Sequence, residues 1–399
     1  MSKPFPANLP TRFEEAFHTE PDFLVRAPGR VDLIGTHTDY NDGWVLPTAI
    51  TRSVWLAVKA MPTAMVTLNA LDLNGEVVFR LTDLSSKRDL TRQPLPTWAQ
   101  YAAGVAWSLQ EAKLATPGTK IAITSNIPIG AGVSSSGAIT VAYATAWSYV
   151  TGWDIDKMKL AQLCQRAEND YVGVNSGLMD QFASLFGQAG HALLFDCRTL
   201  EWEQVPLPDT AALVVADTST RRELAHSAYN ERRASCEEAV AVLKKHLPGI
   251  EALRDVSLED FKRYKQAIPE PARQRAEHII NENKRVCEAA EALRQGDVEQ
   301  LGVLMDASQI SSRDLYEASG PALDAMWEAS QGHPARLGGR FIGAGWAGCL
   351  VFLVRADGAD EFVAHTARRF QEKTNLTPNL YVTQTADGAE VLHEWKRAQ

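Results

Sequence analysis

Residues 120–149, KIAITSNIPIGAGVSSSGAITVAYATAWSY, contain the change of pattern that decides the fold. Residues 120–125 alternate isoleucine with polar or small residues, which predicts a β-strand. Residues 136–149 are mostly small and apolar, which predicts a buried helix. A glycine-rich turn separates the two, so the chain passes from a strand through a turn to the start of a helix.

The turn carries the groups that a phosphate needs. Gly130 and Gly132 lack a Cβ atom, so backbone N–H groups can approach a ligand closely. Ser134, Ser135 and Ser136 add hydroxyl groups at the helix N-terminus, where the helix dipole favours anions. The Gly-Lys-Ser/Thr ending of a Walker A loop is missing. We expect a phosphate-binding loop, with a serine-rich helix cap as the structural alternative.

Outward from this segment, strands and helices alternate near both ends of the chain, and the middle is helical. Expected strands lie at residues 23–26, 53–58, 65–70, 77–81, 349–354 and 380–383, and expected helices at residues 157–172, 222–245, 275–294 and 359–372. This order predicts an α+β or α/β fold in two halves. We expect a first domain over residues 1–190 and a second over residues 191–399.

The composition is that of a globular protein. Of 399 residues, 45% are hydrophobic and 22% charged, which excludes an intrinsically disordered chain. The net charge of −9 disfavours general binding to nucleic acid. No apolar run approaches the ~20 residues of a membrane span and no secretory signal is visible, so we expect a cytoplasmic protein without membrane contact. Five scattered cysteines fit a reducing compartment and form no CxxC zinc motif.

Residues 27–43, APGRVDLIGTHTDYNDG, gather polar side chains in a stretch that we expect to be a loop after a short strand. Paired donors and acceptors such as His37 and Asp39 suit the hydroxyl groups of a sugar. The structural alternative is a tight turn, since Tyr-Asn-Asp-Gly favours turns by itself. His37 and Asp39 could also form half of a metal site, but no further ligand cluster lies near them in the sequence.

A third glycine-rich segment matches a dinucleotide-binding pattern. Gly343, Gly345 and Gly348 form a GxGxxG motif, on which a nicotinamide-dependent dehydrogenase would depend. That motif must open a helix, whereas here it runs into the strand expected at residues 349–354. We therefore reject the dinucleotide-binding interpretation in favour of a glycine-rich loop.

Asp180 differs from most carboxylates of the chain because Leu178, Met179 and Phe182 flank it. A carboxylate among apolar residues needs a partner. Glu168 lies near the end of an expected amphipathic helix. The alternative for both is an ordinary solvated surface group.

These segments together resemble a known family. Residues 28–43 resemble the galactokinase signature, residues 128–136 resemble the ATP motif of the wider GHMP kinases, and the Gly343 segment resembles their third motif. Residues 177–181, GLMDQ, add a fourth match, and the ordered motifs cover nearly the whole chain. The resemblance implies a two-domain α+β GHMP kinase fold. In it, an N-terminal mixed-sheet domain and a helix-rich C-terminal domain enclose the active site.

The resemblance also implies an activity, the transfer of the γ-phosphoryl group of ATP to the anomeric C1 hydroxyl of a sugar, with galactose as the first candidate. Asp180 matches the family's catalytic aspartate, and Arg30 matches the arginine beside it. A neighbouring cation favours the carboxylate, which can then accept the sugar proton. Ser136 and Glu168 match the Mg²⁺ ligands, and Mg²⁺ prefers hard oxygens. The further matches are the ATP-binding residues Gly130, Gly132, Ser134, Ser135, Trp98 and Tyr101, and the sugar-binding residues Thr36, His37, Asp39, Gly177 and Tyr229.

The chain departs from the family at the sugar end. Thr36 stands where the family has a glutamate that contacts the C6 hydroxyl group, and Asp32 replaces an asparagine. In the third motif, Ala344, Trp346 and Ala347 replace Gly, Phe and Gly. A galacto-configured sugar that differs at C6, such as the pentose L-arabinose, is therefore an alternative substrate.

A non-catalytic sensor of sugar and ATP on the same fold is a second alternative, and the presence of both Arg30 and Asp180 argues against it. Trp98 and Tyr101, three residues apart, could also simply pack within a helix. The expected ligands are a small sugar, ATP and Mg²⁺, with neither nucleic acid nor a membrane as partner. We expect a monomer or a weak homo-oligomer.

Overall fold

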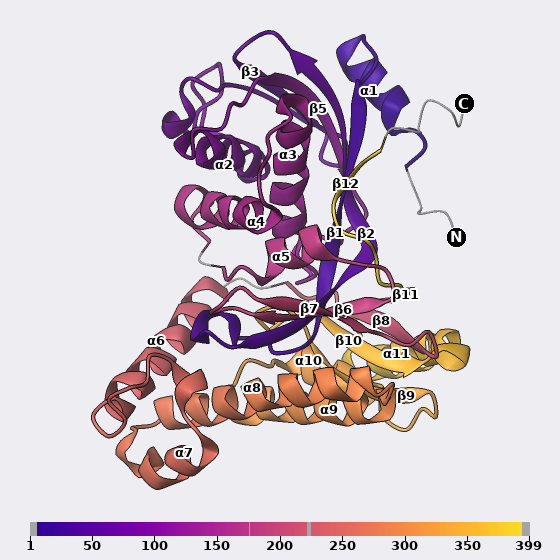
Figure 1. Ribbon diagram of the computed structural model, residues 1–399. Coiled ribbons are helices and arrows are strands. Elements are labelled where there is room, and N and C mark those ends of the chain that lie inside the picture. The colour runs from indigo at the N-terminus through magenta and orange to yellow at the C-terminus, as the bar shows by residue number, and fades with distance from the viewer. Residues whose placement is uncertain (1–5, 175, 222–224, 393–399) are drawn as a thin grey trace.

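The computed structural model describes residues 6–174, 176–221 and 225–392, and for residues 225–227 it describes the backbone only. The chain forms two β-sheets, each with its own helices. In Figure 1 most of the first sheet and helices α2 to α5 occupy the upper half, and the second sheet and helices α6 to α11 occupy the lower half. Strands β6 and β7 of the first sheet lie lower in the view, beside β8.

The first sheet has eight strands in the order β12-β1-β2-β5-β3-β4, with β6 paired to β2 and β7 paired to β6. Strands β3 and β5 run parallel and the other neighbours run antiparallel, so the sheet is mixed. Its strands are β1 (Phe23–Ile34), β2 (Trp44–Met61), β3 (Met65–Ala70), β4 (Gly75–Arg80), β5 (Gly118–Ser125), β6 (His191–Asp196), β7 (Trp202–Pro206) and β12 (Glu390–Leu392). Residues on both sides of position 190 therefore build this sheet.

Helices α2 to α5 cover one face of the first sheet (Figure 1). The first five helices are α1 (Leu9–Phe17), α2 (Thr97–Glu111), α3 (Ser135–Thr151), α4 (Lys157–Arg166) and α5 (Met179–Phe186). Helix α3 confirms the buried helix expected at residues 136–149, and its Val141, Tyr143 and Trp147 are nearly inaccessible to solvent. The helix expected at residues 157–172 is α4 followed by a π-helical turn, Ala167–Val172.

The second sheet is antiparallel, in the order β11-β8-β10-β9. Its strands are β8 (Ala211–Asp217), β9 (Arg336–Phe341), β10 (Cys349–Arg355) and β11 (Asn379–Thr383). Successive side chains of a strand point to opposite faces. Leu213 and Val215 of β8 accordingly pack into the larger core, whereas Val214 and Ala216 pack into a second core. Burial of both faces explains why β8 and β10 are continuous apolar runs.

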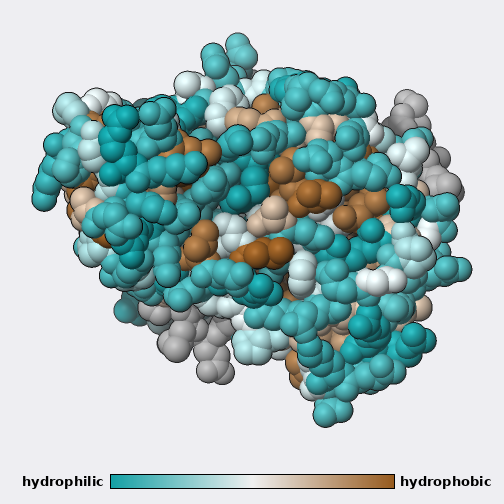
Figure 2. All heavy atoms as spheres, turned by 90° about the horizontal axis from the view of Figure 1, so that it is seen from below, coloured by the Kyte–Doolittle hydropathy of each residue, from teal (hydrophilic) through white to brown (hydrophobic). Residues whose placement is uncertain are grey.

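The remaining helices belong to the lower half of Figure 1. They are α6 (Ala225–Leu243), α7 (Leu258–Tyr264), α8 (Ala272–Arg294), α9 (Val298–Asp314), α10 (Pro321–Ala329) and α11 (Ala359–Thr374). The expected start of α6 at residue 222 lies outside the described residues. Figure 2, seen from below, shows a mostly hydrophilic face with separate hydrophobic patches. Among the described residues, no helix combines the length and the apolar character that a membrane crossing requires.

One expectation from the sequence is wrong. The segment expected to be a loop after a short strand instead continues β1 as far as Ile34, and every residue of that strand is buried. The polar side chains of Arg30 and Asp32 lie inside the strand because they pair with one another, so no water is needed to satisfy them. The loop begins only at Gly35.

Candidate active site

A cavity of about 1050 Å³ lies where the first sheet, α2, α3 and α5 meet the segments that follow β8 and β9. All fifteen residues expected to bind substrate, nucleotide or metal line it. They are Arg30, Thr36, His37, Asp39, Trp98, Tyr101, Gly130, Gly132, Ser134, Ser135, Ser136, Glu168, Gly177, Asp180 and Tyr229. Segments far apart in the sequence therefore form one site.

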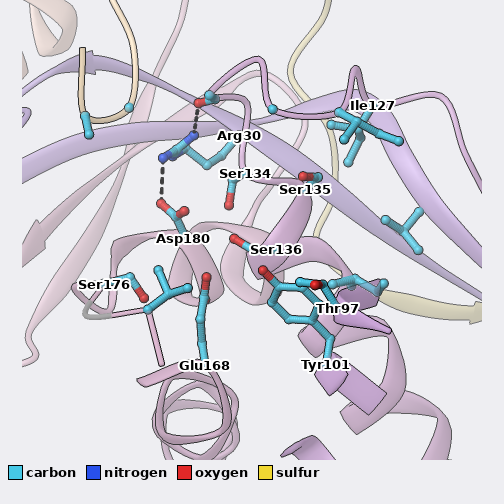
Figure 3. Close-up of a pocket in the computed structure, with 18 of the residues that line it drawn as sticks. Arg30, Thr97, Tyr101, Ile127, Ser134, Ser135, Ser136, Glu168, Ser176 and Asp180 are labelled. Atoms are coloured by element: carbon cyan, nitrogen blue, oxygen red, sulfur yellow. Dashed lines mark hydrogen bonds and ion pairs between the residues drawn. The ribbon is translucent and has the colours of Figure 1, made fainter. Parts of the chain in front are cut away.

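Arg30 lies at the centre of this site. Its Nη2 atom is 2.7 Å from Oδ1 of Asp180, and its Nη1 atom donates to the carbonyl oxygen of Gly132 at 2.7 Å. Figure 3 shows both contacts. The Nε atom lies 2.7 Å from Oδ1 of Asp32, whose other oxygen accepts from the backbone N–H of Gly343 at 3.0 Å. One guanidinium thus connects the candidate catalytic carboxylate, the glycine-rich loop and the third glycine segment.

Asp180 stands in the first turn of α5. A close approach between helices places it there, since a Cβ atom on Gly137 of α3 would lie 2.9 Å from the Cβ of Asp180. Only glycine leaves that space. The partner that the apolar neighbours of Asp180 predict is confirmed to be Arg30.

The backbone at His37 is left-handed, with φ 71°, which non-glycine residues rarely adopt. The Nε2 atom of His37 lies 3.1 Å from the carbonyl oxygen of Ala344, which can only accept, so Nε2 carries a proton. In the neutral ring, Nδ1 then accepts from the Tyr40 hydroxyl at 3.0 Å. The Tyr40 hydroxyl is 2.6 Å from that of Tyr316. The imidazole orientation is therefore held from both sides.

Asp39 lies against the backbone of Gly177, where any larger residue would overlap its carboxylate. Burial, together with the charges of Asp180 and Asp32, raises the pKa of Asp39 to about 6. Tyr229 of α6 lies at the same end of the cavity, where its ring centroid is 5.7 Å from that of His37. These side chains form a polar, aromatic end of the cavity.

The glycine-rich loop leads into α3 through a turn in which every second residue is left-handed. Gly130 has φ 70°, Gly132 has φ 87° and Ser134 has φ 62°. Ser134 does not cap the helix with its side chain, and its Oγ atom has no hydrogen-bond partner among the described residues. The cap alternative thus fails for Ser134, and Figure 3 shows the serines facing the cavity above the start of α3.

Glu168 lies in the π-helical turn, almost inaccessible to solvent. Its Oε2 accepts from Nε2 of Gln181 at 2.5 Å, and the hydroxyl groups of Ser136 and Ser176 also contact it. Burial and the charge of Asp180 raise the pKa of Glu168 to about 7. A buried carboxylate next to a serine hydroxyl is a set of hard oxygens that suits Mg²⁺. No group of three or more His, Cys, Asp or Glu side chains in the described part of the chain could hold a metal by itself.

The rest of the cavity lining is largely apolar, with Asp72, Thr97, Thr124 and Ser125 among its polar members. Trp98 and Tyr101, from the first turns of α2, face the cavity, so they do more than pack within their helix. Burial and the charge of Glu168 raise the pKa of Tyr101 to about 12. The apolar side chains beside them are Val54, Ala70, Leu73, Ile123, Ile127, Ile129 and Ile139. An aromatic ring on a ligand would find apolar contact here.

Three charged residues were not singled out from the sequence. Arg221 lines the cavity, where its Nε donates to the carbonyl oxygen of Ile129 at 3.0 Å and Asp217 accepts two bonds of 2.8 Å from it. Arg340 and Glu282 are inaccessible behind the sugar end. The position of Arg340 directly before Phe341 and Ile342 is a local signal that could have identified it, because an arginine next to apolar residues indicates a buried charge. The role of Glu282 depends on distant segments and leaves no local signal.

Two family models match the chain. Residues 11–60 match the galactokinase galactose-binding signature, and residues 100–188 match the GHMP kinases N terminal domain. A galactokinase of Roseiflexus sp. (strain RS-1) is 40% identical over 380 residues, 95% of each chain. A galactokinase of Homo sapiens is 39% identical over 382 residues, also 95% of each chain.

Solved structures agree with these matches. The crystal structure of Lactococcus lactis galactokinase complexed with galactose superposes with a TM-score of 0.90 at 32% identity, covering 96% of this chain and 99% of that one. The mevalonate kinase of Methanococcus jannaschii shares the fold alone, with a TM-score of 0.63 at 17% identity over 91% and 98% of the two chains. Sequence and structure together show that the chain belongs to the galactokinase family of the GHMP kinases, with their α+β fold.

Proposed function

We propose that this protein is an ATP-dependent sugar 1-kinase that converts galactose to galactose 1-phosphate. The observation that carries the proposal is the contact between Arg30 and Asp180, 2.7 Å, in one cavity with both the glycine-rich loop and the polar sugar end. A binding protein needs no carboxylate at this junction, whereas a phosphoryl transfer does. The sensor alternative is therefore the weaker one.

Each of these residues has a different role in the reaction. Asp180 accepts the proton of the C1 hydroxyl while O1 forms a bond to the γ-phosphorus, and the bond from that phosphorus to the β–γ bridging oxygen breaks to release ADP. Arg30 fixes the orientation of Asp180 and offsets negative charge on the transferred group. His37, Asp39, Gly177 and Tyr229 hold the sugar, and Thr36 lies in the same wall. Because the contacts of Arg30 are within the protein, the geometry is set before substrates bind.

ATP would lie along the other part of the cavity. Trp98 and Tyr101 would contact the adenine ring, and the backbone N–H groups near Gly130 and Gly132 would contact the phosphates together with the hydroxyls of Ser134 and Ser135. Ser136 and Glu168 would hold Mg²⁺, and the unusually high pKa of Glu168 reflects a buried charge that such a cation would compensate. When bound, Mg²⁺ neutralises charge on the phosphates.

The test is ADP release measured with galactose, L-arabinose and a panel of other aldoses. We expect turnover with galactose. Binding of sugar and ATP without turnover of any aldose would support the sensor, and a higher kcat/KM for L-arabinose than for galactose would support the pentose alternative. The two-domain division near residue 190, the cytoplasmic location and a monomeric or weakly oligomeric state accompany this proposal as predictions.

A further inference from the structure

Thr36 contributes an unusual hydrogen-bond donor to the wall of the sugar end. It lies directly after the left-handed Gly35 and lines the cavity beside His37. Nη1 of Arg340 donates to Oγ1 of Thr36 at 2.5 Å. A guanidinium can only donate, so the threonine oxygen accepts this bond and its own proton stays available for a partner. Towards the cavity, Thr36 therefore offers a donor.

Arg340 brings a buried positive charge behind this donor. Its side chain is inaccessible to solvent, and within the described part of the chain its Nε and Nη2 atoms have no hydrogen-bond partner and no carboxylate forms an ion pair with it. Glu282 is paired with Arg285 at 2.7 Å and Asp32 with Arg30 at 2.7 Å, so both nearby carboxylates have cations of their own. Glu282 and Asp32 offset part of the charge of Arg340, but burial outweighs them and lowers the pKa of Arg340, so a further negative charge from a ligand would be favourable.

Among the described residues, four carboxylates line the cavity, those of Asp39, Asp72, Glu168 and Asp180. Asp180 contacts Arg30 at the junction with the glycine-rich loop, and Asp39 lies against Gly177. A negatively charged end of a sugar would be repelled from Asp180 and attracted towards Arg340. This arrangement orients such a sugar with its anomeric hydroxyl at Asp180.

We propose that Thr36, with Arg340 buried behind it, selects a sugar that carries a carboxylate, so that a hexuronic acid of galacto configuration is a second substrate of this site. The inference rests on the proposed kinase function and concerns only the acceptor. A carboxylate can only accept hydrogen bonds, which matches the proton of Thr36, and its charge compensates Arg340. O1 of the uronic acid bonds to the γ-phosphorus, its proton passes to Asp180 and ADP leaves, while the carboxylate is unchanged.

The test compares D-galacturonate with galactose in the wild-type protein, with ADP release and the mass of the sugar phosphate as readouts. We expect kcat/KM for galacturonate to equal or exceed that for galactose. Thr36→Glu places a fixed carboxylate against Arg340, and this carboxylate repels that of galacturonate. The ratio of kcat/KM for galacturonate to kcat/KM for galactose should therefore fall by about tenfold or more. Thr36→Val, which keeps the shape and loses the hydroxyl, should also lower the ratio.

A matched control is Thr63→Glu, since Thr63 is exposed between β2 and β3 and lines no part of the cavity. That variant should leave the ratio unchanged. Because the measured quantity is a ratio within one preparation, partial loss of folded protein cancels. Galactose turnover without galacturonate turnover would overturn the inference, as would an unchanged ratio in Thr36→Glu.

The two proposals fail separately. If neither sugar is phosphorylated, the kinase function is wrong, and calorimetric titration with galacturonate then decides the selectivity alone. If galacturonate binds the wild-type protein and this heat of binding disappears in Thr36→Glu, the carboxylate site is supported. If galacturonate does not bind the wild-type protein, the carboxylate site is overturned.

Discussion

The carboxylate of Glu282 in α8 accepts a hydrogen bond of 3.0 Å from the backbone N–H of Gly35. The adjacent Asn283 accepts from the backbone N–H of Trp44 at 2.8 Å. These two side chains hold both ends of the loop that carries His37 and Asp39. A helix from the second half of the chain therefore fixes the candidate sugar-binding loop of the first half.

The first prediction concerns Glu282. It is inaccessible, and Arg285 and Arg340 lower its pKa to about 2 despite burial. Glu282→Ala would leave these cations uncompensated, which should lower the free energy of unfolding by about 3–5 kcal/mol. Glu282→Gln keeps an acceptor for Gly35, so it should be milder. In both, we expect KM for the sugar to rise more than kcat falls.

The control for Glu282 lies on the same helix. Glu288 forms an exposed i,i+4 pair with Lys284, so Glu288→Gln should change stability by less than about 1 kcal/mol and leave KM unchanged. Chemical denaturation and steady-state kinetics measure both quantities. Equal sugar KM values in Glu282→Gln and the wild type would mean that the carboxylate does not position the loop through its charge.

The second prediction concerns the candidate base. Asp180→Asn keeps the shape of the side chain and removes its ability to take up a proton, so kcat should fall by about 10²–10⁴-fold. The sugar dissociation constant should change little. Stopped assays for kcat and calorimetry for binding separate the two effects. Asp170→Asn, on an exposed carboxylate paired with Arg166, is the matched control, and a wild-type rate in Asp180→Asn would remove Asp180 from the mechanism.

Local periodicity was enough to predict many elements from the sequence. The strand expected at residues 65–70 coincides with β3, and the helix expected at residues 359–372 lies within α11. The course of β1 was predicted wrongly because polar residues in a sequence usually indicate exposure. Arg30 and Asp32 are instead buried as a pair, which only tertiary contacts reveal.

The candidate site was predictable where residue types and spacing carry the chemistry, as in the serines before α3. The supporting contacts were not predictable. Glu282 and Gly35 are 247 residues apart, and Arg340 meets Thr36 across 304 residues. No local pattern encodes such pairs, because each depends on how the two sheets and their helices pack. The catalytic and binding roles themselves stay predictions until variants are measured.

The third prediction concerns pH. Burial raises the pKa of Asp39 from 3.8 to about 6. Between these values the folded protein holds a proton that the unfolded chain has released, so this carboxyl favours the folded state most at low pH and loses that contribution as pH rises through about 6. Sugar hydroxyls need the ionised acceptor, so affinity for galactose should change in the opposite direction and weaken below pH 6.

Calorimetric titration with galactose at several pH values, beside thermal melts, tests this pair of opposite trends. Asp39→Asn has no proton to exchange in this range. Its sugar affinity should be weaker at neutral pH and independent of pH near 6. If the galactose affinity of Asp39→Asn weakened below pH 6 as in the wild type, the group that titrates would be one other than Asp39.

The last prediction separates strain from binding at Ser134. Its backbone is left-handed and its Oγ has no hydrogen-bond partner among the described residues, so in the absence of nucleotide the hydroxyl contributes little to stability. Ser134→Gly relieves the left-handed strain, whereas Ser134→Ala keeps it, so the glycine variant should be the more stable by about 1 kcal/mol. Both variants lack the hydroxyl, so both should raise KM for ATP several-fold, as expected for one lost hydrogen bond of about 1 kcal/mol. A glycine variant that melts higher and yet binds ATP more weakly would show that the strained serine is kept for the nucleotide. Unchanged KM for ATP in both variants would show instead that Ser134 takes no part in nucleotide binding.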